Sequence, residues 1–246
     1  MRSTIGDEWW TELKSITLHD SSEPPSWPAG ASEEYREARR RLSEAELALR
    51  DQAEAVAALR RELPAGAVLP EYRLTEVVGD EQRAVTLADL FGEHDELVVY
   101  HLMFHPDDDE ACPMCSMWVD GFNGVAAHIG QRAGLAAVAK APVDKLRAYG
   151  RYRGWDRIRL VSAYESDLPA DLGAESPGGG QWPALSVFTR DGTVVRHAYT
   201  QSADFPDRSA RGIDLLSPVW NVLDLLPSGR GDWLPHNNYA GRHCRE

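Results

Sequence analysis

The chain has 246 residues, 43% of them hydrophobic, which is enough to build the core of one domain with extensions or of two domains. Its formal charge of -13 at pH 7 argues against a nucleic-acid partner, because phosphate binding draws on a basic surface. No apolar run is long enough to span a bilayer and the N-terminus lacks the apolar core of a signal peptide, so we expect a cytoplasmic protein with no membrane partner.

The first part of the chain divides into two predicted segments. Residues 1–31 are expected to be irregular, because Pro and Gly are concentrated toward their end. Ser32 is a predicted N-cap, and Glu33 and Glu34 would lie in the first turn of the helix that follows. We expect this helix to end near Leu63, so that residues 32–66 form a helical arm.

The apolar residues of the arm recur at a spacing closer to a heptad than to 3.6 residues. Such a stripe packs either on the body of the same chain or on a second subunit, and the sequence leaves both open. The second alternative predicts a homodimer through the N-terminal helix. The stripe consists of Tyr35, Ala38, Leu42, Ala45, Leu49, Val56, Leu59 and Leu63, with Gln52 as an interruption.

Residues 67–230 show the alternation of strands and helices that is typical of an α/β domain. A hairpin and a short helix are expected over 67–92, followed by a buried strand from Glu96 to Phe104. A helix should open at Cys112-Pro-Met-Cys115, since proline suits the first helical turn. Later elements are predicted as strands over 134–140 and 158–163, a helix over 143–153, a hairpin over 184–199 and a last helix over 211–226 that Pro218 kinks or delays.

The predicted order β-α-β-α-β-β-α, with C-x-x-C after an early strand, is that of a thioredoxin-like fold. We therefore predict a central mixed sheet flanked by helices, with a long N-terminal helical arm. Residues 231–246 have turn chemistry and little periodicity, and we expect them to form a C-terminal tail.

Cys112 and Cys115 are the strongest candidates for chemistry. A helix N-terminus carries unpaired N–H groups and partial positive charge, which lower the pKa of a thiol placed there. Cys112 is the predicted nucleophile, and Cys115, one turn later, the predicted resolving thiol. The alternative is a pair of inert buried cysteines, since free Cys is often buried. Cys244 lies near the C-terminus, where a thiol is usually incidental.

The acidic loop Asp107-Asp-Asp-Glu110 immediately precedes Cys112. Its carboxylates should disfavour the thiolate by an amount comparable to what the helix terminus contributes. We therefore expect the two effects nearly to cancel, which would leave Cys112 a mediocre nucleophile near neutral pH.

A metal site is the alternative interpretation of this region. His101 and His105 would share one side of the strand if it continued, and with Cys112 and Cys115 they would form a set of nitrogen and sulfur ligands. Such a set suits zinc or copper. The thiol interpretation, in contrast, requires no cofactor.

Several spaced motifs together resemble the DUF899 family of bacterial thioredoxin-like proteins. The resemblance covers residues 26–239 and implies a thioredoxin-like core with a helical N-terminal extension, and a redox role by analogy of fold alone. The motifs include Val99-Tyr-His-Leu-Met-Phe104, Cys112-Pro-Met-Cys115, Asp120-Gly-Phe-Asn123, Arg153-Gly-Trp155 and Gly229-Arg-Gly-Asp-Trp-Leu-Pro235.

The resemblance also bears on Trp182 and Pro183, which follow a Gly-rich loop and precede a strand. Thioredoxin-like proteins place a cis-proline facing the thiols at this point, and a plain turn proline is the alternative. We expect both residues to line a substrate groove.

The function predicted from the sequence is a thiol–disulfide oxidoreductase or a thiol-dependent peroxidase. Its partners would be a small-molecule or protein thiol or disulfide substrate and a cellular dithiol reductant. A copper- or zinc-binding protein is the second hypothesis, and an interaction module that dimerises through the arm is the third.

Overall fold

The computed structural model describes residues 30–207 and 209–238. Their contacts divide the chain into two units, Met1–Arg61 and Glu62–Glu246. In the described ranges, no helix combines the length and the hydropathy that crossing a membrane requires.

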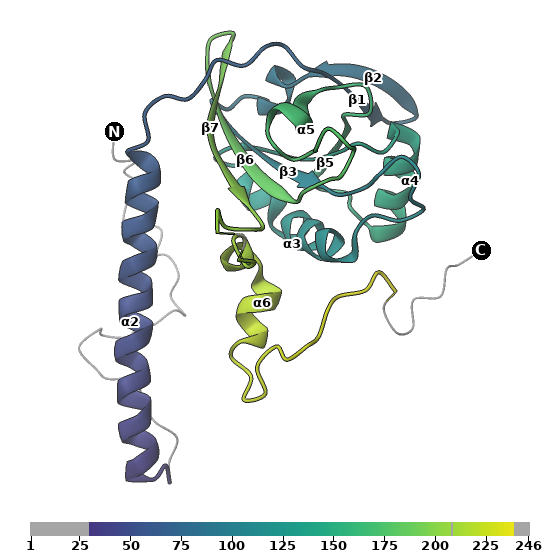
Figure 1. Ribbon diagram of the computed structural model, residues 1–246. Helices are drawn as coiled ribbons and strands as arrows, with labels where there is room; N and C mark the ends of the chain where they lie inside the picture. Colours follow the sequence, from purple (N-terminus) through teal and green to yellow (C-terminus); the bar gives the residue numbers. More distant parts are fainter. Residues whose placement is uncertain (1–29, 208, 239–246) are drawn as a thin grey trace, which may run out of the picture. The chain divides into compact units, whose positions relative to one another are not determined.

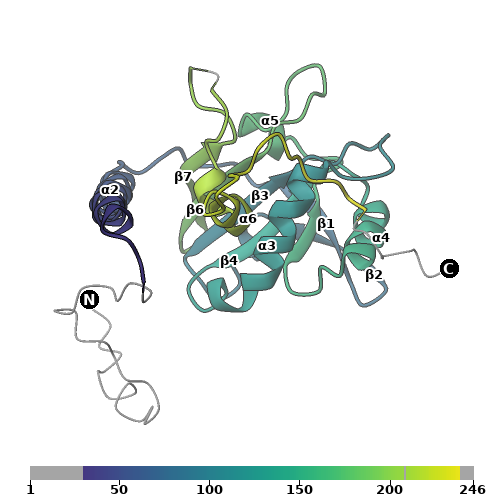
Figure 2. The same ribbon diagram turned by 90° about the horizontal axis from the view of Figure 1, so that it is seen from below.

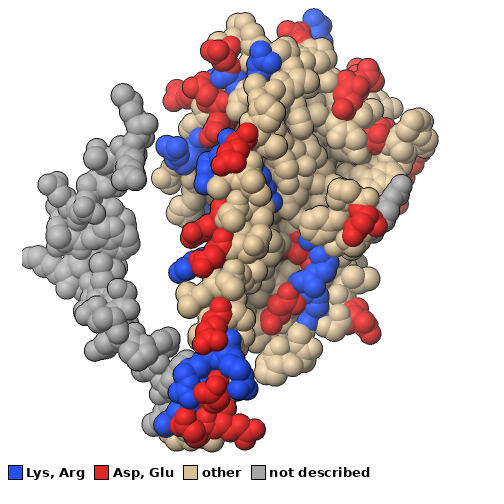
Figure 3. Space-filling view, turned by 60° about the vertical axis from the view of Figure 1, so that its left-hand side comes forward, with Lys and Arg blue, Asp and Glu red and all other residues tan. Residues whose placement is uncertain are grey.

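The described part of the first unit is helix α2 (Glu33–Arg61), which is drawn in Figure 1. Ser32 caps it as predicted, because its Oγ accepts a hydrogen bond of 3.1 Å from the backbone N–H of Tyr35. Arginines in the last turn complement the helix dipole. No residue of α2 is buried, and acidic and basic side chains lie interspersed along it (Figure 3).

The second unit is built on a mixed sheet with the strand order β2-β1-β5-β4-β3-β6-β7. The parallel strands β3, β4 and β5 form its centre, and β6 pairs with β3 in the antiparallel sense. The strands are β1 (Arg73–Val78), β2 (Glu81–Thr86), β3 (Glu96–Leu102), β4 (Gly134–Ala139), β5 (Arg159–Ser162), β6 (Ala184–Asp191) and β7 (Val194–Ser202).

Helices cover both faces of this sheet, as Figures 1 and 2 show. Helices α3 (Pro113–Ile129) and α4 (Val143–Arg153) pack on one face, where Tyr100 and Leu102 of β3 belong to their core. The 3-10 helix η1 (Ala88–Phe91) and the short α5 (Leu168–Asp171) lie against the other core, which contains Leu97 and Val99. Successive β3 side chains thus enter opposite cores, as a pleated strand requires.

The fold predicted from the sequence is confirmed: the protein has a thioredoxin-like α/β fold with an N-terminal helix. The last predicted helix is shorter than expected, since the chain forms only the 3-10 turn η2 (Asp214–Leu216) and α6 (Pro218–Leu223). Pro218 is the first residue of α6, so it delays the helix rather than kinking it.

Two of the sequence motifs have a structural role that positions α3. Asp120 of α3 accepts hydrogen bonds from the guanidinium of Arg153 and from Nε1 of Trp155, the latter at 2.7 Å. Three residues later in α3, Oδ1 of Asn123 accepts hydrogen bonds from the backbone N–H groups of Arg157 and Ile158. These bonds fix α3 against the end of α4 and the start of β5.

Candidate functional site

Cys112 is the N-cap residue of α3, and Pro113 occupies the first helical position. The connection from β3 is short, and its backbone holds the cap in place, since the N–H of Cys112 donates a 2.9 Å hydrogen bond to the carbonyl of Met103. The carbonyl of Cys112 begins the helix by accepting the N–H of Ser116 at 2.9 Å. The sequence therefore places the thiol among the unpaired N–H groups of a 17-residue helix.

The pKa of Cys112 is lowered from 9.0 to about 6. The largest cause is a hydrogen bond from the thiol of Cys115; burial opposes the shift, and the backbone N–H groups of Cys115 and Met114 support it. No carboxylate of the acidic loop is among these causes, so the expected cancellation is wrong. The hydrogen bonds at the helix terminus therefore affect the pKa of Cys112 more than the carboxylates of the acidic loop do, because solvent screens those carboxylates.

Cys115 is buried, and its pKa is raised by its hydrogen bond to Cys112 and by desolvation. The two thiols therefore have opposite states at neutral pH: Cys112 is a thiolate and Cys115 is a thiol that donates to it. Both cysteines are free in the structure.

Tyr100 of β3 lies beneath this pair. Its hydroxyl is buried and has no partner of ordinary hydrogen-bond geometry among the described residues, yet it is close enough to Cys115 to lower the pKa of that thiol. The pKa of Tyr100 is itself raised well above 10.0 by burial and by the two cysteines, so Tyr100 remains a hydrogen-bond donor. This role could not be predicted from the sequence, because Tyr100 has the pattern of an ordinary core aromatic residue.

A cavity of about 520 Å³ opens at Cys112. Its polar lining comes from three separate segments: His105, Asp108 and Glu110 from the connection between β3 and α3, Gln181 from the loop before β6, and Asn237 near the end of the described chain. Met103, Ala111, Cys112, Pro113 and Gly179 complete the wall.

Gln181 and Asn237 are cavity residues that the sequence analysis missed. The side-chain amide nitrogen of Gln181 is buried and has no partner among the described residues, which leaves it able to donate to a molecule in the cavity. Asn237 is anchored by hydrogen bonds from its Nδ2 to Glu110 at 2.8 Å and to the carbonyl of Ala111 at 2.9 Å. Neither residue belongs to a local pattern; each is brought in by a distant segment.

The predicted metal ligands are not brought together. His101 points into the core that contains Leu97 and Val99, where its Nε2 forms a 2.8 Å hydrogen bond with Ser186, whereas Cys115 lies in the core on the other face. Burial and nearby His197 lower the pKa of His101 to about 4. Strand β3 ends at Leu102, so His105 is not a continuation of the same side.

His105 does reach the cavity with Cys112, and its Nδ1 lies 3.6 Å from Asp107. Among the described residues, however, no group of three or more His, Cys, Asp or Glu side chains is arranged to hold a metal ion. The residues present therefore do not fit the zinc or copper site that the spacing suggested.

Trp182 and Pro183 lie next to the site but line other cavities. Trp182 borders a narrow space with His101 and Gln181, and Pro183 borders a cavity of about 510 Å³ with Met114. The bond before Pro183 is trans, which of the two alternatives leaves the plain turn proline. The flanking backbone is held by hydrogen bonds from Trp182 N–H to Ala174 and from Ala203 N–H to Pro183. Their part in substrate binding stays a prediction.

Comparison with known proteins gives a family and a set of structural neighbours. The family model of DUF899, described as a bacterial protein of unknown function, matches residues 24–244. No curated protein matches the chain.

The solved structures that resemble the chain include peroxiredoxins. Enterococcus faecalis AhpC is 11% identical with a TM-score of 0.45, covering 70% of this chain and 98% of its own. A reduced 2-Cys peroxiredoxin of Plasmodium vivax is 12% identical with a TM-score of 0.45, covering 65% and 96%. Reduced Prx3 of Vibrio vulnificus in complex with hydrogen peroxide is 17% identical with a TM-score of 0.41, covering 58% and 89%. At these identities the similarity concerns the fold alone.

Proposed function

The chain belongs to the DUF899 family of bacterial proteins of unknown function, and we propose that it reduces disulfides by exchange at Cys112 and Cys115. The observation that carries this proposal is the asymmetry of the two thiols. Cys112 has a pKa of about 6 at a helix N-terminus, and the buried Cys115 donates a hydrogen bond to it. A thiolate beside a protonated thiol is the arrangement that dithiol exchange requires.

In the first step, the Cys112 thiolate attacks one sulfur of a substrate disulfide. A bond forms between that sulfur and Sγ of Cys112, the substrate S–S bond breaks, and the other substrate sulfur leaves as a thiolate. The cavity of about 520 Å³ gives a substrate access to this sulfur.

In the second step, Cys115 attacks Sγ of Cys112 and releases the remaining substrate thiolate. Cys115 must first lose its proton, and its largest pKa-raising cause is its hydrogen bond to the Cys112 thiolate. That charge disappears when Cys112 enters the mixed disulfide, so the first step itself makes Cys115 easier to deprotonate. The Tyr100 hydroxyl then stabilises the Cys115 thiolate by donating to it.

The product is a Cys112–Cys115 disulfide, and the substrate has gained two electrons. Cys115 releases one proton, and solvent supplies the second when the two substrate thiolates become thiols. A dithiol reductant returns the pair to the reduced state by the reverse exchange. The chemistry resides in the sulfur atoms of the chain, and the proposal assigns no step to a metal or cofactor.

The charges of the cavity bear on the substrate. Asp108 and Glu110 line it, and no Lys or Arg is among its lining residues. Two carboxylates near the reacting sulfur disfavour anionic disulfides and favour neutral or cationic ones. Cystamine, which is cationic, should therefore react faster than oxidised glutathione, which is anionic.

Substitution of each cysteine tests the proposal, in a Cys244→Ser background that removes the third thiol of the sequence. Cys115→Ser should trap a mixed disulfide between Cys112 and cystamine that mass spectrometry detects, and Cys112→Ser should trap none. Turnover of cystamine at the full rate by Cys112→Ser would contradict the mechanism.

Reduction of a peroxide is the second candidate function. The amide nitrogen of Gln181, for which the described part of the chain provides no partner, favours it, because such a donor beside the cavity could bind a peroxide oxygen. Cys112 would take one oxygen to become a sulfenic acid while the alcohol or water leaves, and Cys115 would then form the disulfide with release of water. Gln181→Leu should slow peroxide consumption and leave cystamine reduction unchanged. An equal loss of both rates would argue against a peroxide subsite.

A further inference from the structure

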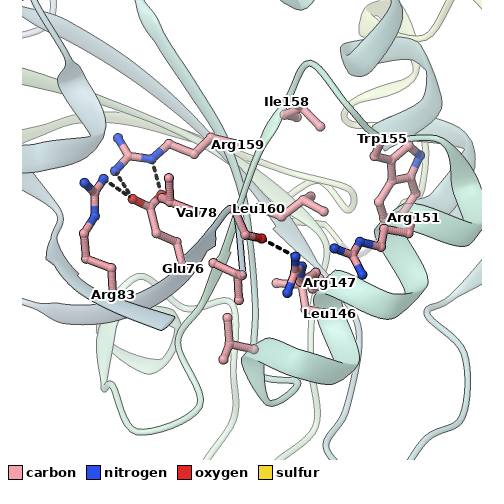
Figure 4. A pocket seen from close by; sticks show the side chains of 13 residues that line it. Glu76, Val78, Arg83, Leu146, Arg147, Arg151, Trp155, Ile158, Arg159 and Leu160 are labelled. Carbon is pink, nitrogen blue, oxygen red and sulfur yellow. Dashed lines mark hydrogen bonds and ion pairs between the residues drawn. The ribbon is translucent and has the colours of Figure 1, made fainter. Parts of the chain in front are cut away.

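The sheet has an open seam at its β1–β5 boundary, away from the cysteine pair. The two strands are neighbours in the sheet, yet they pair only at Thr75 and Ser162. Beyond that point a cavity of about 490 Å³ lies between the β1–β2 hairpin, α4 and β5. We call it the seam cavity; Figure 4 shows its side chains, and its volume is within the range of small-molecule sites.

Four arginines line the seam cavity: Arg83 of β2, Arg147 and Arg151 of α4, and Arg159 of β5. In Figure 4, Arg83 and Arg159 converge on one side, while Arg147 and Arg151 lie on the other side. This concentration of guanidinium groups contrasts with a chain whose formal charge is -13.

The carboxylate of Glu76 neutralises one of the four guanidinium charges. Its side chain is 6% exposed, and Arg159 binds both of its oxygens, at 2.5 and 2.9 Å. Arg83 adds a third contact of 2.5 Å to the same carboxylate. Although burial raises the pKa of Glu76, the two arginines lower it below 4.5, so the group is ionised. Asp89 is a second carboxylate near this pair, since its pKa is lowered by hydrogen bonds from Thr86 and by the charges of Arg159 and Arg83.

Asp80 neutralises only part of the positive charge of Arg147 and Arg151. It lies 2.6 Å from Arg147 and 3.6 Å from Arg151, but its side chain is 93% exposed. An ion pair so exposed to water is weak, and an anion in the cavity could replace it. With the carboxylates of Glu76, Asp80 and Asp89 against four arginines, the seam cavity carries a surplus of one positive charge.

The rest of the lining is apolar. Val78 and Leu160 come from β1 and β5, Leu146 comes from α4, and Trp155 and Ile158 come from the segment between α4 and β5. Arginine recognises carboxylate and phosphate groups with paired hydrogen bonds, and the apolar floor suits a hydrocarbon or aromatic body.

We propose that the seam cavity binds a small organic anion with an apolar body, such as a phosphate monoester or a dicarboxylate. The inference is independent of the cysteine chemistry, since none of the residues that line this cavity lines the one at Cys112.

Titration calorimetry of the full chain tests the proposal with phenyl phosphate and with phenylsuccinate. We expect saturable binding of at least one of these dianions and weaker binding of phenol and of inorganic phosphate, each of which has half of the required chemistry. Binding by neither dianion would overturn the proposal.

Paired variants locate the site. Arg147→Gln with Arg151→Gln should weaken dianion binding by more than about tenfold, because two charge-assisted hydrogen-bond donors are lost. The matched control is Arg157→Gln, an exposed arginine close in sequence that does not line the cavity and should bind as the unaltered chain does. Circular dichroism establishes that the double variant folds, and equal affinity in that folded variant would contradict the assignment.

Discussion

At the scale of single residues, the account depends on which group donates a hydrogen bond to which sulfur. Cys112 is a thiolate at neutral pH because Cys115 and two backbone N–H groups donate to it, and Cys115 stays protonated for the same reason. Tyr100 is the donor that remains when Cys115 loses its proton. Each of these statements predicts a change in pH dependence rather than a simple loss of activity.

The Cys115 donor is tested by the alkylation of Cys112 with iodoacetamide as a function of pH, in the Cys244→Ser background. The rate should rise with a midpoint at about 6, the pKa of Cys112. Cys115→Ala removes the hydrogen bond that lowers the pKa of Cys112 most, so the midpoint should move to higher pH. Cys115→Ser keeps a donor and should move it less. Identical midpoints for the two variants would contradict this role.

Tyr100→Phe removes the donor beneath Cys115 while keeping the aromatic ring. The first step should be unchanged, and resolution of the mixed disulfide should slow by about tenfold, which is the value of one hydrogen bond to a charged group. Stopped-flow measurement with cystamine would show the mixed disulfide accumulating. The companion variant Tyr149→Phe, which loses a buried hydroxyl bonded to Ser116, controls for packing, and a slow resolution step in both would assign the effect to structure.

His101 predicts a pH dependence of stability. Burial keeps it neutral with a pKa of about 4, whereas the unfolded chain gains a proton near 6.5. Stability is therefore lost as the pH falls from 6.5 toward 4, with about 2 kcal/mol of this loss already present at pH 5. Urea unfolding at pH 7 and pH 5 should show a smaller loss for His101→Gln than for the unaltered chain. An equal loss in both would exclude His101 as the cause.

At the scale of elements, periodicity predicted most helices and strands because each has a consistent apolar pattern. Helix α4 is observed over Val143–Arg153 as expected, and the turn of the β6–β7 hairpin contains Gly192, whose φ of 58° only glycine adopts freely. The side of a strand was harder to predict. His101 and His105 have even spacing, but β3 ends between them, and a side chain's face is defined only while the strand continues.

Helix α2 gives a prediction about assembly. Tyr35, Leu42 and Leu49 recur at heptad spacing and are 50 to 62% exposed. In a parallel two-stranded coiled coil, the g and e positions that meet would be Glu34 with Arg39 and Arg41 with Glu46, and both pairs are complementary. An antiparallel pair in full overlap would instead place Arg39 opposite Ala55, without a complementary charge. We therefore expect a parallel homodimer.

Sedimentation of the full chain measures this expectation. Arg41→Glu places like charges at the interface and should shift the protein toward monomer, and the double variant with Glu46→Arg should restore the dimer. Arg50→Glu, at an outer position of the same helix, is the control. A monomeric unaltered chain, or a dimer that Arg41→Glu leaves intact, would contradict the prediction.

At the scale of the whole molecule, the fold assembles the site from segments that are far apart in sequence. The acidic loop, the Gly-rich loop and the segment at Asn237 converge on Cys112, and only the first is adjacent to it in the chain. The spacing of Cys112 and Cys115 could be predicted from the sequence, because one helical turn determines it. Gln181 and Asn237 could not, because their positions depend on tertiary packing.

The seam cavity is a second consequence of the whole fold. Arg83, Arg147 and Arg159 have the pattern of ordinary surface charges in the sequence. They line one cavity only because β1 and β5 separate after a single pair of residues. The cysteine pair and the seam cavity share no lining residue, so the function of each can be tested without the other.

The most direct test of the central claim is a redox titration of the Cys112–Cys115 pair in dithiol buffers, with Cys244→Ser in place. The account predicts one reversible two-electron transition between about -120 and -270 mV, the range of working dithiol oxidoreductases. Because the disulfide needs both sulfur atoms, Cys115→Ser should abolish the transition. Absence of a reversible transition in the unaltered pair would contradict the account.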